Sequence, residues 1–521
     1  MTARVAGVEV EFSDGSGGAK KRRPAGKIAA VAAVVVVALA VRSVFFGYES
    51  GDYRAYFLPW YDFIAQNGGF AALKDNFSNY NVPYLYLVAA LTYTPIPALV
   101  AVKLIPVFFD LVLGFFTYRI VALRYPASWW PTLASAVVLF LPTVVMNSSW
   151  WAQIDASYSS LALGGLYFLM RRRPWLACLF FGLAISFKLQ AIFIFPLLLL
   201  AVLRKYVPWR ALLIVPAVYI ALDLPALLLG ANPRDLLLVY VTEAGTYDQL
   251  TLNAPNVYQF FPSGSSSEVI RIAGVVVTGA LVLGLIIPIV VKRLALTPIR
   301  LVLAGTVSVL LVPYFLPGMH ERYFYLADAL TVVSAFWLPR RLWYVPVLDQ
   351  FASAFSYLPF LLMGLAGGIG GGRPGGGRPG GMGGGPRTRP GGGMGGRPGG
   401  GFGGGFGGGM GGGRPGGGSG GGLGSDLGGG RPGGGFGGGA RTNGGMPALD
   451  TGRPTGMASG GGSGAALVPF PVLSVAMLAA LAIAVWAAVR EFRREEPDAV
   501  PEQPDGEPRP EPVPEDVTSG A

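Results

Sequence analysis

The chain is poor in the two residue types from which most zinc sites are built. Its 521 residues include one cysteine, Cys178, and one histidine, His320. A single cysteine excludes an intramolecular disulfide and a Cys-x-x-Cys metal motif. A zinc site built from histidine and cysteine ligands normally needs several such residues, so this class of site is excluded as well.

Charged residues are also scarce. Asp, Glu, Lys and Arg make up 13% of the chain, whereas hydrophobic residues make up 52% and the mean hydropathy is +0.50. A water-soluble domain normally covers its surface with more charge than this. Apolar runs long enough to cross a bilayer recur along the chain. The sequence therefore predicts an all-α polytopic membrane protein.

The net charge of +11 is also found among nucleic-acid-binding proteins. Here, however, the lysines and arginines lie mostly at the ends of apolar runs or inside a glycine-rich tract. This placement is typical of residues that orient membrane helices. We therefore expect the lipid bilayer as a partner, and no nucleic acid.

The apolar runs predict about twelve transmembrane helices, with both chain ends in the cytoplasm of a plasma-membrane protein. The basic residues before the first run and the triplet Arg171–Arg173 set this orientation, because cytoplasmic loops are enriched in Lys and Arg. No small-residue cleavage site follows the first run, which favours a retained helix over a signal peptide. The expected spans are residues 27–46, 98–121, 130–146, 152–170, two short helices within 174–204, 211–230, 270–291, 301–316, 324–338, 342–365 and 467–489.

Two apolar segments do not fit a simple span. Residues 83–93 are too few to cross a bilayer, so we expect them at the membrane interface. Residues 174–204 are too many for one helix and would place Lys188 at mid-bilayer, where a charge is costly. Two short helices that meet near Lys188 on the outer side explain both features.

Five regions are expected along the chain. Residues 1–26 form a cytoplasmic N-terminal tail, 27–366 a transmembrane module, and 465–489 a last transmembrane helix. Residues 367–464 are dominated by glycine and offer little to bury, so we predict a disordered extracytoplasmic loop. This tract contains no lysine, which argues against a phosphate-binding loop. Residues 490–521 are proline-rich and acidic, typical of a disordered cytoplasmic tail.

Polar residues gather on the outer side of this topology, whereas the inner loops are short and basic. Ionisable residues beside apolar spans are costly, so a group of them indicates a functional site more strongly than any one alone. We therefore expect chemistry near the outer headgroups. The group consists of Asp52, Asp62, Asn147, Gln153, Asp155, Lys188, Asp248, Asn253, Asn256, His320, Glu321 and Arg322.

A candidate general base lies directly after the first span. Asp52 is a carboxylate at the membrane edge, and such a group can accept a proton from a hydroxyl. Asp62 is an alternative, but at about 100° per residue the two carboxylates face different directions on one helix. We favour Asp52. Gln153 and Asp155 lie at the mouth of a later span, and Asp155 is a candidate for binding sugar hydroxyls or orienting a cation.

The remaining candidates are suited to binding a substrate. Lys188 and Arg322 are cations that fit a lipid phosphate, and His320 can assist them. Asn256 completes the set. Glu321 is also a candidate, although Glu321 and Arg322 have an alternative interpretation as an ion pair that caps a helix. The sequence indicates no cofactor and no metal site, although Asp52 and Asp155 together would suit a divalent cation.

Several segments, in order, resemble the glycosyltransferase C superfamily of bacterial multi-pass enzymes. Together they cover most of residues 44–338. The segment around Asp155 is similar to the family's Trp-Gly-Gln-x-Asp motif, with Ala152 where the family often has glycine. The segments are SGDYRAYFLPWYDFI, NVPYLYLVAAL, NSSWWAQIDASYSSLALGGLYFLMRRR, FGLAISFKLQAIFIFPLLLL, NAPNVYQFF and HERYFYLADAL.

This resemblance implies a glycosyltransferase C-like fold and a catalytic role for residues 27–366. It implies transfer of a hexose from a polyprenyl-phosphate donor on the outer face, with Asp52 as the base and the donor phosphate near Lys188, His320 and Arg322. The expected enzyme is inverting and mannosyltransferase-like, and its acceptor hydroxyl belongs to an unknown glycolipid, polysaccharide or protein. A lipid-linked sugar flippase and a scaffold that displays the glycine-rich loop are the alternatives.

Deleting residues 367–464 separates the enzyme from the scaffold. The tract contributes no candidate site residue, so sugar transfer from a polyprenyl-phosphate donor should largely survive the deletion. The measurement is transfer by membranes that contain equal amounts of the full and the shortened chain. A shortened chain that inserts normally but transfers nothing would favour the scaffold.

Overall fold

The computed structural model of the protein describes residues 2–5, 8–11, 24–244, 248–262, 265–369 and 466–494. Apart from residues 367–369, the predicted disordered loop lies outside the described residues. Residues 495–521 of the predicted cytoplasmic tail and most of residues 1–26 also lie outside them. The described membrane helices all belong to one compact unit.

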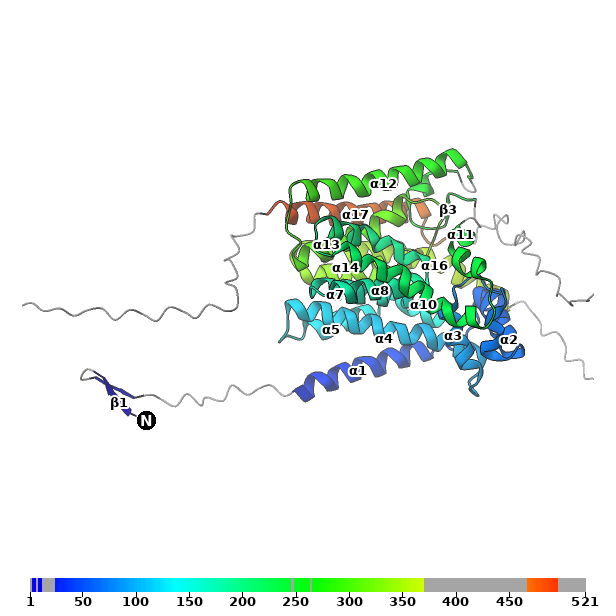
Figure 1. The fold of residues 1–521 in the computed structure, drawn as a ribbon, viewed down its shortest axis with the longest axis horizontal. Coiled ribbons are helices and arrows are strands. Elements are labelled where there is room, and N and C mark those ends of the chain that lie inside the picture. Colours follow the sequence, from blue (N-terminus) through cyan, green and yellow to red (C-terminus); the bar gives the residue numbers. More distant parts are fainter. Residues whose placement is uncertain are drawn as a thin grey trace, which may run out of the picture. The chain divides into compact units, whose positions relative to one another are not determined.

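The described part of the chain is helical almost throughout (Figure 1). Its α-helices are α1 (Pro24–Ser43), α2 (Leu58–Gln66), α3 (Val82–Thr92), α4 (Ala98–Arg124), α5 (Trp130–Leu139), α6 (Pro142–Val145), α7 (Asp155–Met170), α8 (Pro174–Phe187), α9 (Phe195–Leu203), α10 (Ile214–Leu228), α11 (Pro233–Ala244), α12 (Glu268–Val291), α13 (Pro298–Phe315), α14 (Tyr325–Trp337), α15 (Pro339–Leu342), α16 (Val345–Ile369) and α17 (Phe470–Phe492).

Short turns of tighter or wider helix and two small strand pairs complete the fold. The 3-10 turns are η2 (Gly69–Lys74), η4 (Leu189–Ile194), η5 (Trp209–Leu213) and η6 (Val257–Phe260), and the π turns are η1 (Tyr53–Phe57) and η3 (Met146–Trp151). Strands β1 (Thr2–Val5) and β2 (Val8–Glu11) pair antiparallel, and β3 (Thr251–Leu252) and β4 (Met319–His320) pair parallel.

The predicted class, an all-α polytopic membrane protein, is confirmed. Within the described ranges, seven helices are long and apolar enough to cross a membrane, and the bent pair 130–139 and 142–151 raises this to up to eight. Four shorter apolar helices lie among them: Val82–Thr92, Pro174–Phe187, Leu189–Leu203 and Tyr325–Trp337. Large apolar side chains face outward, such as Ile272 and Val291, which are 56% and 73% exposed. Lipid is the solvent that suits such a surface.

The predicted break at Lys188 is also confirmed. Helix α8 ends at Phe187, Lys188 has an extended backbone, and η4 with α9 leads back to Leu203. The two arms end on the same side of the bundle, because the Arg172 guanidinium lies 3.8 Å from the centre of the Tyr206 ring. Lys188 therefore lies at the tip of a helical hairpin.

Basic residues gather at one end of the bundle, which we call the basic end. Lys27 at the start of α1 donates to the Ala127 carbonyl between α4 and α5 at 2.8 Å. Arg204 after α9 donates to the Arg293 carbonyl after α12 at 2.6 Å. Arg341 in α15 lies 3.7 Å from the Glu491 carboxylate in α17. These contacts join α1 to the turn between α4 and α5, the end of α9 to the end of α12, and α15 to the end of α17.

The segments expected as outer loops contain helices of their own. Residues 47–97 form η1, α2, η2 and α3, and half of α3 is buried against α2, α4, α8 and α10. Residues 231–268 include α11, a helix that the sequence analysis did not predict. Strand β3 of this segment pairs with β4, so residues 319–320 lie beside residues 251–252. These elements lie at the ends of the helices opposite the basic end.

A buried ion pair joins three helices inside the bundle. The Arg42 guanidinium of α1 donates to the Asp110 carboxylate of α4 at 2.8 Å, and both side chains are fully buried. Tyr325 at the start of α14 donates to the other Asp110 oxygen at 3.0 Å. Arg42 also donates to the Ala38 and Leu139 carbonyls. The two charges therefore compensate each other, and each of the three guanidinium nitrogens of Arg42 has an acceptor within the protein.

Removing one partner of this pair should be much costlier than removing both. Arg42→Met leaves the Asp110 charge buried without its cation, and we expect a loss of about 3–5 kcal/mol in the free energy of unfolding. Arg42→Met combined with Asp110→Leu should recover most of that loss. Thermal unfolding of the purified variants in detergent measures both effects. Equal losses in the single and double variants would contradict this account.

Candidate active site

Residues from four distant segments converge at the end of the bundle opposite the basic end. The first segment follows α1, and the second leads into the first residue of α7. The third lies between α8 and η4, and the fourth precedes α14. We call the resulting group the polar cluster. It consists of Asp52, Gln153, Asp155, Lys188, His320, Glu321 and Arg322.

The Asp52 carboxylate lies at the partly exposed edge of the cluster. Gln153 donates a hydrogen bond from its side-chain amide to Asp52 Oδ2, and the Tyr80 hydroxyl donates to Gln153 Oε1 at 3.2 Å. The Asp52 charge also acts on His320 and Arg322. Asp62 is exposed and has no hydrogen bond or ion pair among the described side chains. The structure therefore places Asp52, and not Asp62, with the other candidates.

The Asp155 carboxylate is the centre of the cluster and is fully buried. Lys188 Nζ lies 2.6 Å from Asp155 Oδ1, and Asn147 Nδ2 donates to Oδ2 at 2.8 Å. Arg322 Nε lies 3.8 Å from Oδ2. Asp155 opens α7, where the helix dipole also favours a negative charge. One carboxylate thus connects three segments that are far apart in the sequence.

The turn before Asp155 needs an unusual backbone. The π turn η3 ends at Ala152, which has φ 69° and ψ 24°. This left-handed conformation costs an L-residue about 1–2 kcal/mol. It allows Gln153 N to donate to the Asn147 carbonyl at 2.8 Å, and Ser50 Oγ to donate to the Trp151 carbonyl. Single π turns are frequent at functional sites, and η1 and η3 flank this cluster on two sides.

Arg322 is held by the loop between β4 and α14. The Arg322 guanidinium donates to Glu321 Oε1 at 2.9 Å and lies 5.7 Å from the centre of the Trp151 ring. The ion pair expected from the sequence is therefore present, but α14 begins without a side-chain cap. The Nε of Arg322 is buried and has no hydrogen-bond partner among the described residues. Since Arg322 also approaches Asp155, it belongs to the site and does not serve only to end a helix.

Burial and neighbouring charges shift two pKa values in this loop. Burial lowers the pKa of His320, and the Arg322 charge lowers it further, so His320 is neutral at pH 7. Burial alone would raise the pKa of Glu321, but the His320 hydrogen bond and the Arg322 charge outweigh it and hold this pKa below its usual value. Glu321 is therefore ionised beside Arg322, with His320 Nδ1 3.7 Å from its carboxylate.

Asn256 is the sequence candidate for which no contact with the polar cluster is found among the described residues, and its buried side-chain Nδ2 has no hydrogen-bond partner there. Its side-chain oxygen accepts from Tyr258 N at 3.2 Å, and its carbonyl accepts from Ser474 Oγ of α17 at 2.7 Å. Among the described residues it makes no hydrogen bond or ion pair with the polar cluster. These contacts show Asn256 shaping the loop between β3 and η6, near the strand pair that holds His320.

Two aromatic residues of the site were not among the sequence candidates. Tyr80 bonds to Gln153 and lies 5.6 Å from Lys188 Nζ, measured from its ring centre. Trp151 packs against the guanidinium of Arg322. Trp151 lies two residues before the candidate Gln153, whereas no spacing relates Tyr80 to any candidate. Its place before α3 in a stretch rich in tyrosine and asparagine was the available signal.

The described side chains include no group of three or more His, Cys, Asp or Glu residues placed to hold a metal ion. What the polar cluster offers chemically is a partly exposed carboxylate, a buried carboxylate with two cations, and an arginine donor without an acceptor. Such a set can take a proton from a hydroxyl and bind a phosphate.

Comparisons with known proteins give little. No family model matches the chain, and no curated protein matches it. Solved structures are similar to the chain. One of them is the crystal structure of ArnT from Cupriavidus metallidurans bound to undecaprenyl phosphate, with 13% sequence identity, 67% of this chain and 72% of that chain covered, and a TM-score of 0.44. A similarity this weak says nothing about the function of this chain.

Replacing Ala152 with glycine tests the strained turn. Glycine adopts positive φ without a steric cost, so Ala152→Gly should not lower the free energy of unfolding and should raise it by up to about 1 kcal/mol. As the matched control, Ala162→Gly inside α7 should lower it by about 0.5–1 kcal/mol. Thermal unfolding in detergent measures the difference. Equal destabilisation by both glycines would show that position 152 is not strained.

Proposed function

We propose that the chain is a membrane glycosyltransferase of the glycosyltransferase C type that acts on the outer face of the plasma membrane. It moves a hexose, with mannose as the first candidate, from a polyprenyl-phosphate donor to an acceptor hydroxyl. The observation that carries this proposal is the polar cluster, which unites the candidate base with the candidate phosphate-binding residues. The motif resemblance noted in the sequence supports the same activity.

The orientation follows from the two ends of the bundle. Positive residues concentrate on the cytoplasmic side of membrane proteins, so we assign the basic end to the cytoplasm. Both the start of α1 and the end of α17 then lie inside the cell. Helix α7 starts at Asp155 and ends just before the arginines at 171–173, and α14 starts three residues after Arg322 and ends just before Arg340 and Arg341. The polar cluster consequently faces outward, and residues 27–366, which contain it, form the catalytic module.

The reaction that we propose is a single displacement with inversion. Asp52 accepts the proton of the acceptor hydroxyl, while the Gln153 amide holds one carboxylate oxygen in place. The hydroxyl oxygen then bonds to the anomeric carbon of the sugar. The bond from that carbon to the phosphate oxygen breaks, and the electron pair leaves with the polyprenyl phosphate. A base of this kind contributes about 10²–10⁴-fold to the rate.

The phosphate needs cations, and the cluster supplies two. Arg322 has the unpartnered Nε donor, and an arginine in this state gains a charge-assisted hydrogen bond when a phosphate oxygen arrives. Lys188 is fixed by Asp155 at 2.6 Å, so its charge is positioned before the donor binds. Positioned cations stabilise the charge that develops on the leaving phosphate. Asp155 acts by holding Lys188 in place, with its carboxylate facing Arg322 as well.

The decisive variants are Asp52→Asn and Asp62→Asn. Asparagine keeps the shape of Asp52 and its contact with Gln153 but cannot accept the acceptor's proton. We expect Asp52→Asn to lower kcat by about 10²–10⁴-fold with little change in thermal stability, whereas Asp62→Asn leaves transfer intact. The measurement is transfer of radiolabelled sugar from polyprenyl-phosphate donors by purified protein. Normal turnover of the Asp52 variant would remove this residue from the mechanism.

A further inference from the structure

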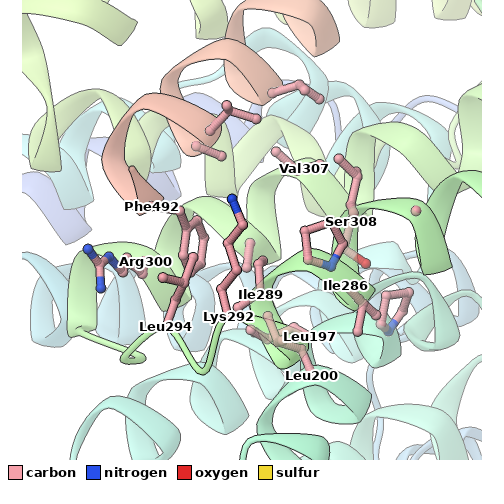
Figure 2. A pocket seen from close by; sticks show the side chains of 18 of the residues that line it. Leu197, Leu200, Ile286, Ile289, Lys292, Leu294, Arg300, Val307, Ser308 and Phe492 are labelled. Carbon is pink, nitrogen blue, oxygen red and sulfur yellow. The ribbon is translucent and has the colours of Figure 1, made fainter. Parts of the chain in front are cut away.

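A cavity far from the polar cluster lies between α9, α12, α13 and α17. Its volume is about 670 Å³, within the range of about 300–1,000 Å³ that is typical of ligand pockets. Its walls are mostly apolar, and they include Leu197, Leu200, Ile286, Ile289 and Val307 (Figure 2). Neither the proposed reaction nor the sequence motifs account for this cavity.

The mouth of the cavity is strongly basic. Five of the residues that line it are cations: Lys292, Arg293, Arg300, Arg493 and Arg494. In Figure 2 the Phe492 ring lies between Arg300 and Lys292. The lining of this one cavity therefore combines hydrocarbon walls with a cationic rim.

Three of these cations show two different roles. Arg300 is buried and donates to the carbonyls of Ala295, Glu491 and Arg494, so it ties the end of α17 to the turn before α13. Lys292 and Arg493 are exposed, and their side chains have no hydrogen bond or ion pair within the described ranges. Arg300 therefore shapes the rim, while Lys292 and Arg493 have charge available for a ligand.

The cavity and the polar cluster have no residue in common. The α13 residues that line the cavity run from Arg300 to Leu311, whereas Glu321 and Arg322 follow the end of this helix. The cations of the lining lie at the start of α13 and directly after α12 and α17. The cavity is thus at the basic end, and its ligand does not share the site proposed for sugar transfer.

The wall formed by α12 faces lipid. In Figure 1 this helix lies at one edge of the bundle and α1 lies at the opposite edge. Ile286 of α12 is buried towards the cavity, whereas Ile287 and Val291 on adjoining positions are exposed. A hydrocarbon chain from the surrounding bilayer therefore meets the cavity without crossing water.

We infer that this cavity binds an anionic phospholipid of the cytoplasmic leaflet. A lipid acyl chain fills the apolar space beside Leu197 and Ile286, and the lipid phosphate meets Lys292 and Arg493. Basic pockets between membrane helices on the cytoplasmic side suit anionic headgroups, and each basic residue near the surface strengthens the attraction. This inference does not depend on the sugar-transfer reaction.

The acidic residues 495–521 are the competing occupant, because they directly follow Arg494 in the sequence. Their carboxylates would satisfy the cations of the rim. A proline-rich acidic segment would nevertheless leave the apolar walls uncovered, and burying those walls is the larger gain for a hydrocarbon chain. A lipid accounts for both the apolar walls and the cationic rim, whereas the acidic segment accounts for the rim alone.

Two glycines of α12 allow a matched test of whether the apolar space of the cavity holds the lipid. A Cβ added at Gly284 or at Gly279 meets no atom within 4 Å, but only Gly284 lines the cavity. Native mass spectrometry of the purified full chain, titrated with dioleoyl phosphatidylglycerol, measures lipid that stays bound. We expect Gly284→Leu to reduce binding by at least about tenfold and Gly279→Leu to leave it unchanged. Equal binding by both variants would overturn the inference.

The same binding measurement tests the role of the exposed cations and of the acidic residues 495–521. Lys292→Gln combined with Arg493→Gln should weaken phosphatidylglycerol binding by about tenfold or more, whereas Arg171→Gln combined with Arg173→Gln, which lie outside the cavity, should not. Dioleoyl phosphatidylcholine should bind weakly to the unchanged protein. A chain ending at Arg494 should bind phosphatidylglycerol as the full chain does. Binding that appears only after this truncation would assign the cavity to the acidic tail, and equal binding of the two lipids would overturn the role of the cations.

Discussion

A charge inside this bundle has no water to compensate it, so its partner must come from another segment of the chain. Asp155 shows the consequence: its carboxylate is satisfied by Asn147, Lys188 and, at longer range, Arg322. Leaving a buried ion without its partner costs several kcal/mol. The segments before α7, between α8 and η4, and before α14 are therefore stable only when assembled. The same contacts that fold this end of the bundle also create its candidate active site.

Helix α14 connects this site to the rest of the bundle. Arg322 precedes α14 and reaches Asp155, and Tyr325 at the first position of α14 donates to Asp110. Asp110 in turn pairs with Arg42 of α1. The two buried carboxylates thus hold opposite sides of one short stretch of chain. A small shift of this stretch would disturb both, which keeps Arg322 in a fixed position relative to Asp52 and Lys188.

The sequence was sufficient for features that depend on local composition. Most helix ends fall within a few residues of the predicted spans, and the hairpin tip at Lys188 follows from a charge inside an overlong apolar run. Features that depend on tertiary partners were not predictable in this way. Nothing in the spacing relates Tyr80 to Gln153, or Arg42 to Asp110, because their proximity arises only when distant helices pack. Helix α11 was missed because its apolar run of six residues is too short to predict a span and is flanked by polar residues.

The two ends of the bundle use cations in different ways, and this difference bears on what each end selects. At the basic end, Lys292 and Arg493 are exposed and have no acidic partner within the described ranges, so an anionic headgroup binds there mainly through its charge. In the polar cluster, Lys188 and Arg322 already face Asp155 and Glu321. A phosphate that binds there must compete with these carboxylates, even at Arg322 Nε, which makes no hydrogen bond but lies 3.8 Å from Asp155 Oδ2. Cations that already face a carboxylate therefore select a ligand by the position of its phosphate and not by its charge alone. We expect abundant phospholipids to be retained at the basic end, and the polar cluster to respond only to a ligand that presents its phosphate and its reacting carbon together.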